Sequence, residues 1–183
     1  MESRKVHGIM FCIPIMAENT EEALEKMAEA GRLGSADVFE IRLDLMAAFD
    51  LPRILKAASR PVLVTYRSGP EGGKGSADPE TRAARILEAL REGAQLVDVE
   101  LSLPAPWREK VMEAGKTSEI VISVHDHEGT PDTAELERLL EDCVATGGDI
   151  IKIVTTANTW TDNFRILELI PGARERGQKI VAF

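Results

Sequence analysis

The sequence predicts an α/β fold, a (β/α)8 TIM barrel that here lacks its last βα segment. Short β-branched runs alternate with amphipathic helical stretches along the whole chain, which is typical of a parallel sheet covered by helices. Strand positions on one side are charged or polar, which favours a barrel over an open sheet. A length of 183 residues suits one core, so residues 1–183 are expected to form a single, C-terminally incomplete barrel domain.

Each element follows from its own residues. Strands are predicted where β-branched and apolar residues cluster, at 8–15, 38–43, 61–66, 96–101, 119–125, 149–155 and 179–183. Helices are predicted between them, at 20–30, 51–58, 79–92, 105–114, 133–146 and 162–175. Asn19 or Thr20 offers an N-cap for the first helix, and Gly31 is expected to close it. Asp78 and Pro79 are typical of a helix start, which predicts the beginning of the third helix.

The second strand decides between a barrel and an open sheet. Its charged residues alternate with apolar ones, Glu40, Arg42 and Asp44 against Phe39, Ile41 and Leu43. An open sheet has helices on both faces, where three charges would be costly unless they were paired. A barrel turns one face toward its axis, and the same parity recurs at Thr65 and Arg67, Asp98 and Glu100, Ser123 and His125, and Lys152. No glycine-rich phosphate loop follows the first strand, which disfavours nucleotide binding.

Composition excludes several classes of partner. The 31 acidic against 22 basic residues give a formal charge of -9, which would repel nucleic acids and anionic membrane surfaces. Because no apolar run approaches the roughly 20 residues of a membrane span and no signal peptide is evident, we expect a cytoplasmic protein. Cys12 and Cys143 lack metal or CxxC spacing, so both are expected to be buried thiols.

Lys152 is a candidate nucleophile. It lies within Ile150 to Val154, and aliphatic neighbours on a buried strand make an ammonium costly to desolvate, which favours the neutral amine. A neutral amine attacks a carbonyl to form an imine, and the protonated imine is an electron sink for deprotonation of the adjacent carbon. The alternative, equally compatible with the pattern, is a structural lysine paired with Glu100 or Asp98.

His125 is a candidate proton carrier at the rim of the same pocket, because imidazole titrates near neutral pH. The alternatives are a structural histidine or a metal site with Asp126 and His127. Adjacent strand residues point in opposite directions, so convergence on one ion is disfavoured and no metal is expected.

A carboxylate and two guanidiniums are expected at the mouth of the barrel, from Glu40, Arg42 and Arg67. Arginine forks suit a small carboxylated, hydroxylated molecule, although a structural salt-bridge network would leave the same pattern. The glycine-rich segment 68–75 is either a mobile lid or a flexible turn, and it carries Glu71.

Five segments carry a resemblance to a known family: Glu40-Ile41-Arg42-Leu43-Asp44, Thr65-Tyr66-Arg67-Ser68 with Glu71-Gly72-Gly73, Asp98-Val99-Glu100, Ser123-Val124-His125-Asp126, and Ile151-Lys152-Ile153-Val154. In this order, on consecutive strands, they resemble type I 3-dehydroquinate dehydratases. The resemblance implies a cofactor-free lyase of the shikimate pathway, which makes aromatic amino acids, and a homodimer. It implies that Lys152 forms an imine with the C3 ketone, His125 moves protons, and Glu71 tunes His125. Glu40, Arg42 and Arg67 would bind the substrate 3-dehydroquinate.

One departure from that family concerns the end of the sequence. Members continue past the strand matched by 179–183 into a turn with a substrate-binding arginine, then an eighth strand and helix. Seven strands leave two unpaired edges, so we expect an incomplete chain, with a partner-completed or degenerate barrel as the alternatives. The competing functions are a Schiff-base aldolase and a non-catalytic truncated barrel that associates with another chain through its open edge.

Overall fold

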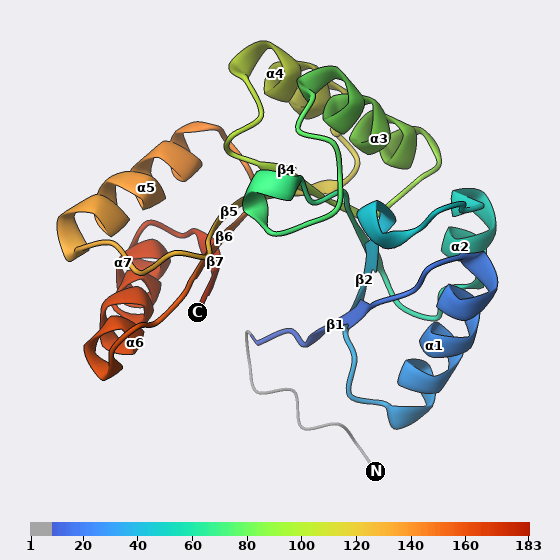
Figure 1. The fold of residues 1–183 in the computed structure, drawn as a ribbon, viewed down its shortest axis with the longest axis horizontal. Helices are drawn as coiled ribbons and strands as arrows, with labels where there is room; N and C mark the ends of the chain where they lie inside the picture. Colours follow the sequence, from blue (N-terminus) through green and yellow to red (C-terminus); the bar gives the residue numbers. More distant parts are fainter. Residues whose placement is uncertain (1–8) are drawn as a thin grey trace.

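The computed structural model describes residues 9–183, so the first residue of the first predicted strand, Gly8, lies outside them. Among these residues, seven parallel strands form one sheet in sequential order from β1 to β7 and curl through much of a barrel (Figure 1). Their bounds are β1 Cys12–Ile15, β2 Val38–Arg42, β3 Val62–Thr65, β4 Leu96–Glu100, β5 Glu119–Asp126, β6 Ile150–Thr155 and β7 Lys179–Ala182. The predicted α/β fold, with parallel strands curled as in a TIM barrel, is therefore confirmed.

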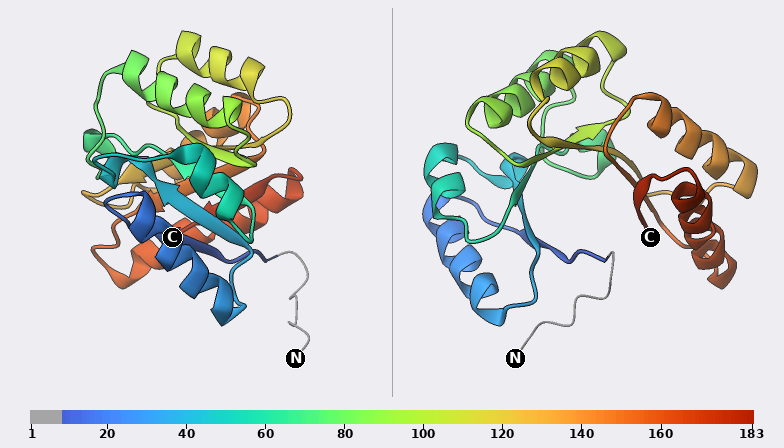
Figure 2. Two further views of the ribbon diagram at one scale, coloured as in Figure 1. Left: turned by 90° about the vertical axis from the view of Figure 1, so that its right-hand side faces the viewer. Right: turned by 180° about the vertical axis from the view of Figure 1, so that it is seen from behind.

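Helices follow the strands and cover the outer, convex side of the sheet, as two further views show (Figure 2). They are α1 Thr20–Leu33, α2 Leu51–Ala57, α3 Pro79–Arg91, α4 Ala105–Ala114, α5 Thr133–Ala145, α6 Trp160–Leu167 and α7 Leu169–Glu175. Two single 3-10 turns, η1 Leu43–Leu45 and η2 Gly69–Glu71, follow β2 and β3 and were not predicted. Asn19 and Asp78 cap α1 and α3 through their side chains, as expected.

Strand alternation divides the apolar side chains between two places. One face of every strand packs against the helices in the main core, where Phe39, Ile41, Ile122 and Ile151 are fully buried. The other face begins, at the floor of the concave side, with a small apolar layer of Val38, Leu63, Leu96, Val121 and Ile150. Two residues further along each strand the concave face becomes polar, because side chains repeat with a period of two. This places the charged residues above an apolar floor.

Two helix predictions were wrong. α1 continues through Gly31 and ends at Gly34, which has the left-handed φ of 70° that suits a glycine cap. The predicted helix 162–175 is two helices separated at Glu168. Pro171 lies in the first turn of α7, where the helix needs no hydrogen bond from its nitrogen. A helix continuous with α6 would need a hydrogen bond from that nitrogen to the carbonyl of Leu167, and proline has no N–H to donate.

The edge strands differ from the middle ones. β1 and β7 each pair with one strand only among the residues described, and they lie on the two sides of the opening in Figure 1. Cys12 on β1 is exposed, which corrects the expected buried thiol, whereas Cys143 is buried. Large apolar side chains are exposed near both ends of the described residues, at Phe11 before β1, at Trp160 and Phe164 on α6, and at Val181 and Phe183 in or after β7. Within residues 9–183, every helix is too short or too polar to cross a bilayer.

Candidate active site

Lys152 projects from β6 onto the concave face. Its Nζ lies 3.6 Å from Oε1 of Glu40 and 3.8 Å from Oδ2 of Asp98, and its side chain is 14% exposed. The apolar surroundings predicted for the amine are wrong, because Ile151 and Ile153 point to the opposite, helix-covered side. Two carboxylates at this distance stabilise a positive charge on nitrogen and oppose the effect of burial. The predicted alternative, a pairing with Asp98, is part of the observed arrangement.

Arg67 joins three strands beneath the mouth of the barrel. Its guanidinium donates to Oδ2 of Asp98 at 2.7 Å, to Oε1 of Glu100 at 3.0 Å and to Oγ of Ser123 at 2.9 Å. Arg67 is 3% exposed, so these charges pair with one another out of contact with water. The structural salt-bridge network, left open by the sequence, therefore describes the observed contacts of Arg67.

The buried carboxyl of Asp98 is held ionised by its neighbours. Burial alone raises its pKa, but the positive charges of Arg67 and Lys152 and a hydrogen bond from Ser123 outweigh burial and hold the pKa below its usual range. Oγ of Ser123 donates to Oδ1 of Asp98 at 2.6 Å. Asp98 thus links the arginine network to the candidate nucleophile. The sequence indicated Asp98 as a polar inward residue, as part of a motif and as a possible partner of Lys152, but its contact with Arg67 was not predicted.

His125 and Glu71 meet as the resemblance implies. Nδ1 of His125 lies 3.1 Å from Oε2 of Glu71, and both side chains are about one-tenth exposed. Glu71 is carried by η2, so the glycine-rich segment after β3 brings a carboxylate back over the end of β5. An ionised carboxylate only accepts, so a hydrogen bond to Glu71 requires a proton on Nδ1 of His125 and directs Nε2, the other ring nitrogen, away from Glu71.

Lys152 and His125 belong to one face of the sheet. Ser123 on β5 is the register partner of Lys152 on β6, and register partners in a parallel pair point to the same side. His125 is two residues beyond Ser123 and therefore points to that side as well. Asp98 on the adjacent strand β4 contacts both of these strands, through Lys152 at 3.8 Å and through Ser123 at 2.6 Å. The amine and the imidazole consequently share the concave cup.

Glu40 and Arg42 lie on β2, which pairs with β3, the strand that leads to Arg67. Oε1 of Glu40 accepts from Oγ1 of Thr65 at 2.7 Å and faces Lys152. Arg42 forms a two-pronged pair with Asp44, at 2.8 Å for each nitrogen. This pair leaves the side chain of Arg42 18% exposed at the mouth. Arg42 is thus accessible to a ligand, whereas Arg67 is enclosed.

The glycine-rich segment is a tied turn in this structure. The N–H of Gly69 donates to the carbonyl of Gly75 at 3.0 Å, and that of Gly75 donates to the carbonyl of Arg67 at 2.9 Å. Asp44 accepts from the N–H of Arg67 at 3.2 Å and of Lys74 at 3.1 Å. Asp44 was predicted only as an inward charge, and its role as the anchor of this segment required the fold.

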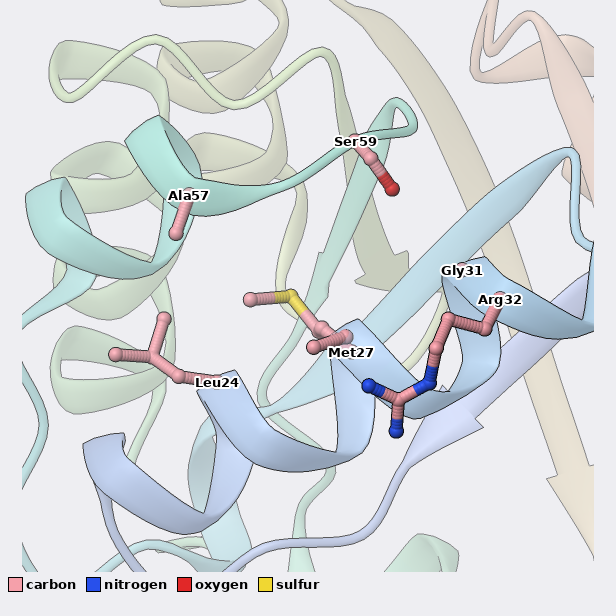
Figure 3. A pocket seen from close by; sticks show the side chains of 7 residues that line it. Leu24, Met27, Gly31, Arg32, Ala57 and Ser59 are labelled. Atoms are coloured by element: carbon pink, nitrogen blue, oxygen red, sulfur yellow. The ribbon is translucent and has the colours of Figure 1, made fainter.

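A groove between α1 and the end of α2 is unrelated to these groups (Figure 3). It lies on the helical layer and is lined by Leu24, Met27, Ala28, Gly31, Arg32, Ala57 and Ser59. Among residues 9–183, its lining includes no lysine, histidine or carboxylate, so these residues do not offer the groups that imine or proton-transfer chemistry needs. The concave face of the sheet therefore remains the candidate active site.

Comparison of the sequence with known families and curated proteins gives a consistent result. Residues 11–183 match the family model described as Type I 3-dehydroquinase. The chain is similar to 3-dehydroquinate dehydratase of Desulfotalea psychrophila, 30% identical over 185 residues, covering 100% of the chain and 78% of the relative. It is similar to that of Pyrococcus abyssi, 33% identical over 176 residues, covering 95% and 77%.

A third relative is much longer. The bifunctional 3-dehydroquinate dehydratase/shikimate dehydrogenase of Arabidopsis thaliana is 33% identical over 171 residues, which cover 90% of this chain and 28% of that protein. The chain thus spans 28% of this relative and, by the preceding figures, over three-quarters of the other two.

Solved structures support the same fold. The 3-dehydroquinate dehydratase of Geobacillus kaustophilus has a TM-score of 0.85 and 25% identity, covering 96% of this chain and 73% of that one. The type I enzyme of Clostridium difficile with covalently modified comenic acid has a TM-score of 0.83 and 24% identity, covering 94% and 73%, and shows the fold alone. The same holds for an aldolase, QR15, with a TM-score of 0.67 and 17% identity, covering 95% and 78%.

Proposed function

Because this chain belongs to the type I 3-dehydroquinase family, we propose that it dehydrates 3-dehydroquinate to 3-dehydroshikimate through an imine on Lys152. The observation that carries this proposal is the common cup, in which a lysine and a carboxylate-bound histidine share one face of adjacent strands. The amine supplies the covalent sink and the imidazole supplies proton transfer, so the chemistry requires neither a metal nor a redox cofactor.

The reaction begins with attack of the neutral Lys152 amine on the C3 ketone. The adduct then takes up one proton and loses water, which gives an iminium ion. His125 removes a proton from C2, and the electron pair moves onto the iminium nitrogen to form an enamine. Return of that pair expels the hydroxyl, which takes its proton from His125. Hydrolysis of the new iminium releases the product, the free amine and the proton that was taken up when the first iminium formed. Each proton that His125 takes is returned, so the enzyme ends as it began.

The carboxylates around Lys152 have a purpose in this scheme. Glu40 and Asp98 lie within 4 Å of Nζ, where they stabilise a positive charge. The iminium ion carries that charge at the same nitrogen, so a pair that holds the resting ammonium also favours the covalent intermediate. This pairing has a cost, because the ammonium must lose a proton before the amine can attack the ketone. The sequence had instead predicted apolar surroundings that favour the neutral amine.

Substrate hydroxyls and carboxylate are proposed to bind at Glu40, Arg42 and Arg67, with Glu71 orienting His125. Arg42 is the accessible arginine, and its fork suits a carboxylate. A ligand reaches Arg67 only by replacing one of its present partners, of which Glu71, with Oε2 3.6 Å from Nη1, is the most distant. We further propose a cytoplasmic homodimer, and light scattering of the purified protein would measure the assembly.

Borohydride trapping tests the proposed function directly. The protein is incubated with 3-dehydroquinate and sodium borohydride, and peptide mass spectrometry locates the added mass. We expect one adduct at Lys152 and none at Lys179, an exposed lysine on β7 that pairs with Glu119. Dehydration that proceeds without any adduct at Lys152 would contradict the imine mechanism, whereas an adduct at several lysines would show unspecific amine chemistry.

The aldolase alternative is supported by the fold likeness to QR15, which carries no information about substrate. It predicts trapping with a simple aldehyde or ketone donor and no dehydration of 3-dehydroquinate. The non-catalytic alternative is supported by the exposed apolar side chains of β7 and α6. It predicts no adduct with either compound and association with another chain that depends on those residues.

A further inference from the structure

We propose that Ser102, held by Arg82, is a positioning residue that fixes the carboxylate of Glu71 toward His125. This inference rests on the proposed role of His125 as the proton carrier. Ser102 follows β4 in a turn, and Arg82 lies on α3, so neither belongs to the strand pattern that identified the other candidates. Their contacts extend the site beyond the residues that the sequence indicated.

The two oxygens of Glu71 have different partners. Oε1 accepts a hydrogen bond from Oγ of Ser102 at 2.6 Å, while Oε2 faces Nδ1 of His125 at 3.1 Å. Glu71 is 8% exposed, so water has little access to its carboxylate, whereas Ser102 is exposed. A carboxylate held at both oxygens cannot turn about its last bond without losing one contact. Ser102 therefore holds the oxygen that His125 does not use.

The direction of the Ser102 hydrogen bond follows from Arg82. Nη2 of Arg82 lies 2.8 Å from Oγ of Ser102, and a guanidinium only donates. Oγ must accept from Arg82, which leaves the hydroxyl hydrogen for Glu71. Without Arg82 the hydroxyl would be free to rotate. Arg82 therefore donates to Ser102, and Ser102 donates to Glu71.

Arg82 is itself fixed in a buried position. Its Nη2 lies 2.5 Å from Oε2 of Glu100, whose other oxygen accepts from Arg67 at 3.0 Å and from the N–H of Ser68 at 2.9 Å. Oε2 of Glu100 has no contact of good hydrogen-bond geometry, so this is a charge contact rather than a directed bond. The buried arginine network and the Glu71–His125 pair are therefore connected through Ser102.

The consequence for His125 is electrostatic. The groups that act on its ring are Glu71 from η2, Asp98 from β4 and the ring of His127, whose centroid is 6.3 Å away. Arg67 competes for Glu71, since Nη1 lies 3.6 Å from Oε2. Loss of the Ser102 hydroxyl would let the carboxylate turn toward Arg67, and the imidazolium would lose its fixed counter-charge.

The test compares Ser102→Ala with Ser102→Thr, which keeps a hydroxyl, and with Ser35→Ala, an exposed serine in the connection between α1 and β2. Ser102 is itself exposed, so removal of its hydroxyl should leave the fold intact, as circular dichroism would verify. We expect kcat of Ser102→Ala to fall by about 10- to 100-fold with KM little changed, because a misplaced proton carrier affects the chemical step. Ser102→Thr should restore most of kcat.

A second readout does not depend on turnover. An NMR pH titration of the His125 ring should show its midpoint moved to lower pH in Ser102→Ala, and close to the wild-type midpoint in Ser102→Thr and Ser35→Ala. An unchanged midpoint in Ser102→Ala would overturn the inference even if the enzyme dehydrates its substrate. Failure of borohydride trapping at Lys152 would instead reject the proposed function, and the titration would still report whether Ser102 positions the pair.

Discussion

The middle strands β2 to β5 and the edge strands β1 and β7 differ in how far their concave-side residues are buried. On the concave side of the middle strands the charged groups are enclosed and pair with one another, with Arg67 only 3% exposed among its carboxylates. On the edges, by contrast, Cys12 is exposed and Val181 is 41% exposed. Lys152 on β6 stands between these regions, paired in register with Ser123 on one side and Val181 on the other.

This difference shows which strands hold the charged groups of the site in fixed positions. A buried charge is tolerated only when it is paired, so the middle strands carry a fixed arrangement of acceptors and donors. An edge strand has one neighbour and imposes no such order on its side chains. The proposed reaction groups accordingly lie on or beside the ordered side of the cup, and Lys152 is their member nearest to the open side.

The largest effect is expected at Lys152 on β6, which lies between the middle strands and the edge strand β7. Lys152→Ala should abolish both turnover and borohydride trapping, because it removes the amine that is proposed to form the imine. The measurement is the absorbance of product with time, with Lys179→Ala on the edge as the control that should retain activity. Measurable dehydration by Lys152→Ala would remove the imine mechanism.

The next largest effect is expected at His125. His125→Ala should lower kcat by roughly 10²- to 10⁴-fold, the usual contribution of a positioned acid or base. The adduct at Lys152 should still form, because imine formation precedes the proton transfer that this residue is proposed to carry. Trapping and turnover are measured on the same sample, and a parallel loss of both would assign His125 to substrate binding or to folding instead.

Arg67 tests whether the middle strands depend on their buried pairs. Arg67→Met should lower the free energy of unfolding by about 3–5 kcal/mol, because it leaves Asp98 and Glu100 buried without their shared cation. Arg53→Met removes an arginine that is paired with Glu21 on the surface and should change stability little. Urea denaturation of both variants measures the difference, and equal midpoints would mean that the network contributes no stability.

Acid should destabilise the protein through Asp98. Its folded pKa lies below the unfolded value of about 4, so its stabilisation is present above that pH and is lost as the pH falls through the folded pKa. Unfolding measured at several acidic pH values should therefore show stability that rises with pH. Asp98→Asn, less stable at neutral pH, should show a shallower rise, and an identical slope would exclude Asp98 as a source of the dependence.

The smallest effect is expected on the edge itself. Val181→Thr should change the free energy of unfolding by less than about 0.5 kcal/mol, since this residue is 41% exposed. The same substitution at Val64, which is fully buried on β3, should cost about 1–3 kcal/mol, because the new hydroxyl enters the apolar core. A comparable loss at both positions would show that the two regions are equally ordered.

Much of this site was accessible from the amino-acid order. The alternation of Glu40 and Arg42 with apolar residues predicted the concave face, and the parity of Ser123 and His125 with Lys152 predicted that their side chains share it. The contacts of Ser102 and Arg82 were not predictable, because they join a turn and a helix that are far apart in sequence. The predicted apolar surroundings of Lys152 were wrong, because its neighbours along β6, Ile151 and Ile153, point to the opposite face of the sheet.

The amino-acid order by itself determined the strand and helix rhythm, the polar inner face and the set of chemical groups offered there, because these depend on periodicities of two and about 3.6 residues. Only the tertiary structure decided which carboxylate each cation holds, since sheet register and the path of the glycine-rich turn bring Glu71, Arg67 and Asp98 within reach of their partners. It also decided that Arg67 is enclosed and Arg42 accessible, because exposure depends on what covers a side chain in space.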